Sequence, residues 1–237
     1  MHRFVWNVRY AAPESLGHRY PISAIVHDTA LEPQGAWALP GRYTVTLTVD
    51  GKSYAKPLLL KMDSRVKSTA SDLTQQFAMQ REATEGMSES FQALTQLRST
   101  RNQVKAALEK SSSAQTKQKL SEFDKKAAAL EGAAVPGFSG VPVSGKKPEN
   151  FSTLNQRFGQ ILGIADAADA APTTQTAAVG KELSVALQEN LARWRQLKGS
   201  DLLELNQLLE QEKAGTINPE RRIADAPSTD VDGDDEP

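Results

Sequence analysis

The stretch Arg42-Tyr43-Thr44-Val45-Thr46-Leu47-Thr48-Val49-Asp50-Gly51-Lys52 decides the first part of the fold. Its apolar residues alternate with Arg and Thr, and this period of two is typical of a β-strand with one apolar face. Asp50-Gly51 suits a type I′ turn, because both central residues of that turn need positive φ. Residues 52–62 then return as a second strand, in which Pro57 lacks a ladder N–H. We therefore predict a β-hairpin with Pro57 at an edge or bulge.

A further strand is predicted upstream of the hairpin. Phe4, Trp6, Val8 and Tyr10 occupy every second position of residues 4–10 and would share one strand face. Residues 11–39 contain three prolines that break regular elements. Since three strands cannot close a sandwich, we expect an incomplete Ig-like β module over residues 1–67. Its missing strands would lie before Met1, or its edge would stay open.

From residue 68 the apolar period changes to that of helices. Thr69 or Ser71 can cap a first helix of almost 40 residues, and the polar run Ser111–Ser113 separates it from a second helix. The apolar stripe of the first helix is Leu73, Phe77, Met87, Phe91, Leu94, Leu97, Val104 and Leu108, and that of the second is Leu120, Phe123, Ala127 and Leu130.

Three more helices are expected after a loop rich in Gly and Pro at residues 132–149. Asn150 can cap the third helix, and Pro172 ends the alanine-rich stretch before the fourth. Gly199 is predicted to end the fourth helix, and Asp201 to open a short fifth helix as a capping box. The stripes are Phe151, Leu154, Phe158, Ile161 and Ala165, then Val179, Leu183, Leu187, Leu191, Trp194 and Leu197, then Leu205, Leu208 and Leu209. The short connections favour an antiparallel helical bundle over residues 68–215, which makes the predicted class α+β.

Composition excludes several classes of function. The 237 residues include 28 basic and 29 acidic side chains. Residues 1–67 hold nine Lys/Arg against five Asp/Glu, and residues 220–237 hold two against seven, so residues 216–237 are predicted to form a disordered acidic tail. No dense basic stripe for nucleic acid occurs. There is no cysteine, no apolar run long enough for a bilayer, and no signal-peptide core at the start.

No residue qualifies as a catalytic, cofactor-binding or metal-binding residue. The histidines His2, His18 and His27 lack the short spacing of a metal site. The acidic run Asp230–Glu236 does not follow the EF-hand pattern, and the loop at 132–149 contains no phosphate-binding motif. The carboxylates on predicted helices are interpreted as solvated, and they are Glu82, Glu85, Glu89, Asp166 and Asp169.

The aromatic side chains divide into two groups. Those on helix stripes are predicted to pack in the core, and they are Phe77, Phe91, Phe123, Phe151, Phe158 and Trp194. Trp6, Trp37 and Tyr43 belong either to the core of the β module or to an interface with an upstream domain.

Several stretches together resemble the C-terminal part of bacterial sortilin-like proteins, also described as BNR/Asp-box repeat or glycosyl-hydrolase-like proteins. The stretches that carry the resemblance, over about residues 1–213, are Phe4–Tyr10, Pro40–Val45, Asp50–Tyr54, Met62–Val66 and Ala168–Thr173 through to Leu191–Trp194. In that family a β-propeller precedes this region. The propeller's Asp-box, S-x-D-x-G-x-T-W, does not occur in this chain, so the resemblance gives no residue a role in binding or hydrolysis. It implies an extracytoplasmic bacterial location, periplasmic or secreted.

The hypothesis that follows is a non-catalytic protein-interaction or structural module, without a cofactor, within a larger extracytoplasmic assembly. The partner would be a protein or an upstream propeller domain. Two alternatives stay open. In one, the chain is an accessory region of a secreted sialidase-like or glycosyl-hydrolase-like propeller protein. In the other, it is a free-standing coiled-coil scaffold subunit. The sequence identifies neither the partner, nor a ligand, nor the oligomeric state.

Overall fold

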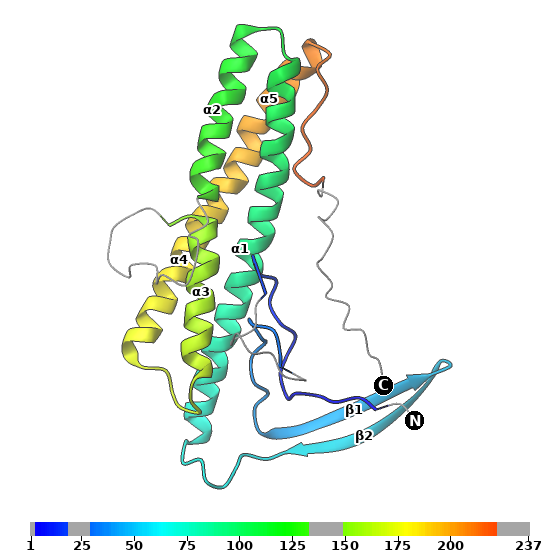
Figure 1. The fold of residues 1–237 in the computed structure, drawn as a ribbon, viewed down its shortest axis with the longest axis vertical. Coiled ribbons are helices and arrows are strands. Elements are labelled where there is room, and N and C mark those ends of the chain that lie inside the picture. The colour runs from blue at the N-terminus through cyan, green and yellow to red at the C-terminus, as the bar shows by residue number, and fades with distance from the viewer. Residues whose placement is uncertain (1–2, 19–28, 133–148, 222–237) are drawn as a thin grey trace. The chain divides into compact units, whose positions relative to one another are not determined.

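The computed structural model describes residues 3–18, 29–132 and 149–221, and its fold is a mixed α+β fold (Figure 1). One two-stranded antiparallel sheet precedes a series of helices. Contacts divide the chain into two compact units. The first consists of Met1–Ser90 with Leu154–Leu187, and the second of Phe91–Thr153 with Gln188–Pro237. The predicted boundaries at residues 67 and 215 stay predictions.

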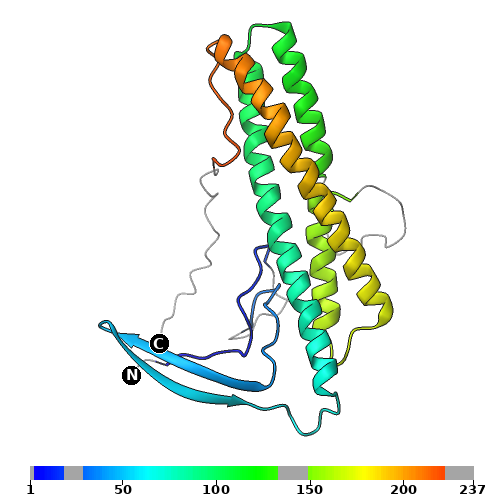
Figure 2. The same ribbon diagram turned by 180° about the vertical axis from the view of Figure 1, so that it is seen from behind.

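The sheet is the predicted hairpin, built from β1 (Gly41–Val49) and β2 (Lys52–Leu60). Asp50 and Gly51 have φ of 50° and 75°, which confirms a turn with two positive φ values. Figures 1 and 2 show the strands as one long two-stranded ribbon. Pro57 lies opposite Thr44, and with only two strands in the described sheet both are edge strands. The expectation of an edge position for Pro57 is therefore confirmed.

The strand predicted at residues 4–10 is wrong. The structure gives this segment one isolated bridge, between Arg9 and Trp37, and no strand. Val8 has φ of 57°, a left-handed conformation that is costly for a β-branched residue and breaks the extended backbone. Alternation marks a strand only when a neighbouring strand pairs along its length, and among the described residues no such neighbour exists.

The helices match most of the predicted spans. They are α1 (Ala70–Lys110), α2 (Ala114–Glu131), α3 (Phe151–Asp166), α4 (Thr174–Gln196), the π-helix η1 (Leu197–Asp201) and α5 (Leu202–Gln211). None of the helices in the described part of the chain is both long and apolar enough to cross a membrane. Residues 133–148 of the predicted loop and 222–237 of the predicted tail lie outside the described residues.

The predicted starts of α1 and α3 are confirmed by side-chain caps. At the start of α1, the Thr69 hydroxyl accepts from the Asp72 N–H (3.2 Å), and the Asp72 carboxylate accepts from the Thr69 N–H (2.8 Å). The Asn150 side chain likewise accepts from the Thr153 N–H (3.0 Å). Each exchange satisfies main-chain N–H groups that a helix start leaves unpaired.

The predicted end of the fourth helix at Gly199 and the predicted capping box at Asp201 are wrong. The backbone passes through the π-turn of η1 and continues directly into α5. Asp201 has helical φ and ψ of −69° and −40°, and its side chain makes no cap hydrogen bond. Its carboxylate instead accepts from Lys126 at 2.7 Å. This ion pair to α2 uses the side chain that a cap would require.

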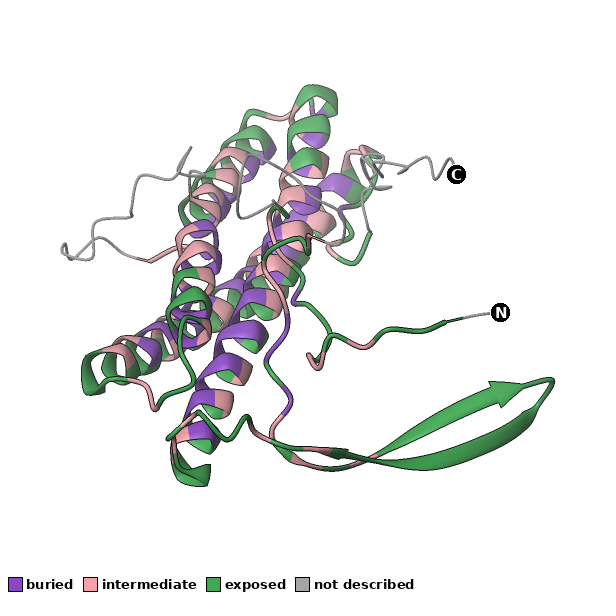
Figure 3. Cartoon of the chain, turned by 60° about the horizontal axis from the view of Figure 1, so that its bottom comes forward, coloured by how far each residue is buried: buried purple, intermediate pink, exposed green. Residues whose placement is uncertain are grey.

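Each unit has an apolar core to which the predicted helix stripes contribute most of the residues (Figure 3). Phe77 and Phe91, which the stripes place in the core, are only half-buried. Buried residues of the first unit include Leu73, Ala83, Met87, Leu154, Phe158, Ile161, Leu162, Leu183 and Leu187. Those of the second include Leu94, Leu97, Val104, Leu120, Phe123, Leu130, Trp194, Leu197, Leu202, Leu205 and Leu209. Within the second unit α2 packs against α5.

Candidate functional site

The two faces of the hairpin differ sharply in chemistry. Residues directly opposite each other share a face, and the register pairs Tyr43 with Leu58, Leu47 with Tyr54 and Thr46 with Ala55. We call one side the apolar face, and it consists of Tyr43, Val45, Leu47, Val49, Tyr54 and Leu58 with Lys52 and Lys56. The opposite face carries Arg42, Thr44, Thr46, Thr48, Ser53, Ala55, Pro57 and Leu59.

Apart from Tyr43, which is half-buried, the apolar face is open to solvent in the described structure. Leu47 is 60% exposed, Tyr54 57% and Val45 52%. Figure 3 colours nearly the whole hairpin as exposed. A contiguous exposed apolar surface is unusual on a soluble protein and marks an interaction site or an aggregation liability.

Both long edges of the hairpin are also open. A two-residue turn makes Val49 and Lys52 a hydrogen-bonded pair, and the pattern then alternates along the ladder. The main-chain groups of the intervening residues therefore point outward, and on β1 these are Arg42, Thr44, Thr46 and Thr48. Across residues 3–18, 29–132 and 149–221, no main-chain hydrogen bond outside the hairpin itself reaches them.

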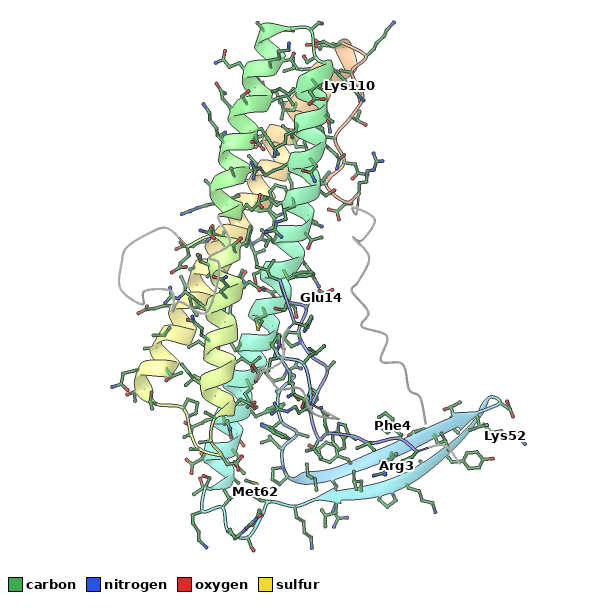
Figure 4. All side chains as sticks on the ribbon, viewed as in Figure 1. Arg3, Phe4, Glu14, Lys52, Met62 and Lys110 are labelled. Carbon is green, nitrogen blue, oxygen red and sulfur yellow. The ribbon has the colours of Figure 1, made fainter. Side chains whose placement is uncertain are left out.

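The hairpin carries mainly positive charge. Lys52 lies at its turn end (Figure 4), and Lys56 lies on the apolar face. Arg42 lies on the other face, and Lys61 directly follows β2. A partner for the apolar face would therefore meet ammonium groups among the exposed aliphatic and aromatic side chains.

A charged anchor holds the segment that precedes the hairpin to the helices of the first unit. The Arg9 guanidinium donates to both carboxylate oxygens of Asp166 (2.9 Å each) and to the Gly35 carbonyl (2.9 Å), and it lies 3.6 Å from the centre of the Trp37 ring. Gln80 on α1 accepts from the Trp37 N–H at 3.1 Å. The Arg9 side chain is only 7% exposed, so these are strong, partly desolvated contacts.

Aromatic side chains join this segment to the base of β1. The Trp6 and Tyr43 rings meet edge to face with centroids 5.6 Å apart, and the Tyr43 hydroxyl donates to the Leu39 carbonyl at 2.6 Å. Burial is the main cause that raises the pKa of Tyr43 above its usual value of 10. The electrostatic effect of the nearby Tyr10 raises it further. Phe4, by contrast, is 88% exposed on the same segment.

The carboxylates singled out in the sequence do not form one site. Glu82 accepts from Ser184 (2.5 Å), Glu85 pairs with Arg81 (2.5 Å) and Asp166 pairs with Arg9. The described residues contain no group of three His, Cys, Asp or Glu positioned to hold a metal ion. His18 is exposed, while His2 and His27 lie outside the described residues.

The sequence interpretation missed the role of Arg9 and Asp166. The sequence places Asp166 on a solvated helix face and Arg9 within a predicted strand. The two residues are 157 positions apart and have no shared motif, so no local signal in one sequence could have paired them.

No model of a known protein family, no curated protein and no solved structure matches this chain. The resemblance to the sortilin-like proteins therefore stays a prediction.

Proposed function

We propose that this chain is a non-catalytic protein-interaction module whose docking surface is the apolar face of the hairpin. In this proposal the hairpin is part of an Ig-like sandwich that the partner completes or covers, and the helices form an antiparallel bundle that supports it. The assembly is extracytoplasmic. The proposal rests on the sequence interpretation together with the site described above.

The observation that carries the proposal is the exposure of the alternating apolar residues on the hairpin. Burying a Leu or Val side chain stabilises a structure by about 1.5–3 kcal/mol relative to leaving it exposed. Leu47, Val45 and Val49 make only part of this contribution in the described chain, since each is 48–60% exposed. A bound protein surface would supply it.

The proposed partner is a protein surface that is apolar at its centre and carries carboxylates at its rim. Apolar side chains would cover Leu47 and Tyr54, and carboxylates would meet Lys52 and Lys56, which flank them on the same face. Charged pairs at such a rim set orientation and association rate more than affinity.

The test compares two leucines of matched exposure on opposite faces of the hairpin. Leu47 on the apolar face is 60% exposed, and Leu59 on the other face is 56% exposed. Proteins retained from the source cells by the full chain are compared with those retained by Leu47→Ser and Leu59→Ser. We expect a protein that Leu47→Ser loses and Leu59→Ser keeps. Equal retention by both variants, or no retention above background, contradicts the proposal.

A related alternative is that the partner surface belongs to a propeller domain of the same polypeptide, so that the chain is an accessory region of a sialidase-like or glycosyl-hydrolase-like protein. The gene sequence distinguishes the two. Repeated Asp-boxes and a signal peptide in the same reading frame would favour the alternative.

A further inference from the structure

We propose that two copies of this chain pair through the outer edges of β1, in antiparallel register centred on Thr46, to form one four-stranded sheet. This goes beyond the proposed function, because it concerns the edge of the sheet and not its apolar face. The occupant of the edge is a second copy of the chain.

The two edges of the hairpin differ in what prevents pairing. Natural edge strands are protected by Pro and Lys, which block an added strand. On β2, Pro57 has no N–H to offer at an outward-pointing position, and Lys52 and Lys56 add charge. On β1 the outward positions are three threonines and Arg42, with neither Pro nor Lys along the strand. The edge of β1 is therefore the one built to accept a strand.

The sequence of β1 is complementary to itself about Thr46. When two β1 strands run antiparallel with Thr46 opposite its own copy, Thr44 lies opposite Thr48. Threonine pairs across strands are favourable, and all of these residues lie on one face. On the apolar face the same register places Val45 opposite Leu47 and Tyr43 opposite Val49. Polar residues thus meet polar residues, and apolar residues meet apolar ones.

Charge selects the same register. Arg42 is the only charged residue within β1, and Asp50 is the only acidic residue between Gly41 and Leu60. With Thr46 on the two-fold axis, Arg42 of each copy comes alongside Asp50 of the other, which gives two opposite-charge pairs. A register shifted by two residues would lose both pairs. A parallel arrangement would place Arg42 beside its own copy, and like charges directly opposite are destabilising.

The pairing would also enlarge the proposed docking surface. Because paired residues share a face, the two apolar faces would adjoin as one surface across four strands. Two-fold pairing of identical strands is a closed interface, so it would stop at a dimer.

The experiment measures the mass of the full chain in solution by light scattering over a range of concentrations. We expect a dimer of the 25.7 kDa chain. Thr46→Pro removes an N–H that points away from β2 and should raise the dissociation constant by about tenfold or more. The matched control is Ala55→Pro, because Ala55 is the residue directly opposite Thr46 and its N–H points to the other edge. That variant should dimerise like the parent chain.

A monomeric parent chain at every concentration, or equal dimerisation by both proline variants, overturns the pairing. If both proline variants dissociate or misfold, disulfide cross-linking through single introduced cysteines tests the pairing, since the chain has no cysteine of its own. In the proposed register the two Cα atoms at position 46 lie about 5.5 Å apart, within disulfide range. Thr46→Cys should cross-link under mild oxidation and Ala55→Cys should not. Absence of a cross-link in Thr46→Cys overturns the pairing.

The outcome is separable from that of the proposed function. A monomeric chain that still loses its partner protein on Leu47→Ser overturns the pairing and leaves the docking surface standing. If the chain dimerises and the two leucine variants retain the same proteins, the docking surface is overturned and the pairing stands.

Discussion

The hairpin and the helices both arrange apolar residues with a regular period, but only the helices bury them. In α2, Leu120 and Ala127 are fully buried and Phe123 is 2% exposed. In β1, Val45, Leu47 and Val49 are about half exposed. The same kind of pattern therefore stabilises the helices from within the chain, whereas in the strands the described residues leave it about half exposed. The difference shows that a regular apolar pattern predicts a surface to be covered, and does not say what covers it.

Truncating one leucine of the helices and one leucine of the hairpin gives the largest expected difference in the free energy of unfolding. Leu120→Ala removes a side chain with no solvent exposure and should lower the free energy of unfolding by about 2–5 kcal/mol, through lost burial and the cavity left behind. Leu47→Ala should change it by less than about 0.5 kcal/mol, because Leu47 is 60% exposed. Urea unfolding of the isolated chain measures both. A loss at Leu47 as large as that at Leu120 would show that the hairpin is covered in solution.

The anchor at Arg9 is the next largest expected effect. Arg9→Met keeps much of the side chain's volume but removes the donors to Asp166 and Gly35, and should cost about 1.5–3 kcal/mol. Arg65→Met is the control, because the Arg65–Asp63 pair is exposed and such pairs contribute little. We expect no measurable change there. Unfolding curves that coincide for the two variants would mean that the anchor does not hold the first unit together.

Sequence reasoning succeeded where the signal is local. The turn at Asp50-Gly51 is confirmed because the conformation depends on two adjacent residues. The start of α1 is confirmed because Thr69 and Asp72 satisfy each other's N–H groups three positions apart. The edge position of Pro57 is confirmed because it follows from the residue itself, which has no N–H for a ladder hydrogen bond.

Sequence reasoning failed where a side chain far along the chain determines the local structure. Phe4–Tyr10 alternates like a strand, but Arg9 binds Asp166 on α3 and Val8 turns the chain. Asp201 is well placed for a cap, yet it binds Lys126 on α2, and the helix continues through a π-turn. Neither pairing can be read from neighbours in the sequence, so local rules alone assigned these segments wrongly.

A smaller effect tests how closely the helices of the first unit pack. A Cβ added to Gly86 on α1 would lie 2.6 Å from the Phe158 ring, so Gly86→Ala should cost about 1–3 kcal/mol despite the better helix propensity of Ala. At Gly163 on α3 an added Cβ meets no atom within 4 Å. Gly163→Ala should therefore stabilise the chain by about 0.5–1 kcal/mol. Thermal unfolding would show shifts of opposite sign. Shifts of the same sign would contradict close packing at Phe158.

The smallest expected effect is a pH dependence in the second unit. The Glu212 carboxylate accepts hydrogen bonds from the hydroxyls of Ser111 (2.6 Å) and Thr116 and from the Ser112 N–H (3.1 Å). The Ser111 and Thr116 hydroxyls are the main cause that lowers its pKa from 4.5 to about 2. Because the folded state holds this pKa below that of the unfolded state, the stabilisation is complete above about pH 4.5 and is lost as the pH falls toward 2.

Glu212→Gln isolates this contribution from that of the other carboxylates. It removes the charge and keeps the shape, so the parent chain should have the higher Tm at neutral pH. The difference in Tm should shrink as the pH is lowered through the interval between the two pKa values. Glu210→Gln, at an exposed position on α5, controls for the loss of one negative charge. A constant difference between the parent chain and Glu212→Gln across this interval would show that the hydroxyls hold the carboxyl group equally well in either protonation state. The network would then stabilise the junction of α1 and α2 through its geometry, without a contribution from the charge.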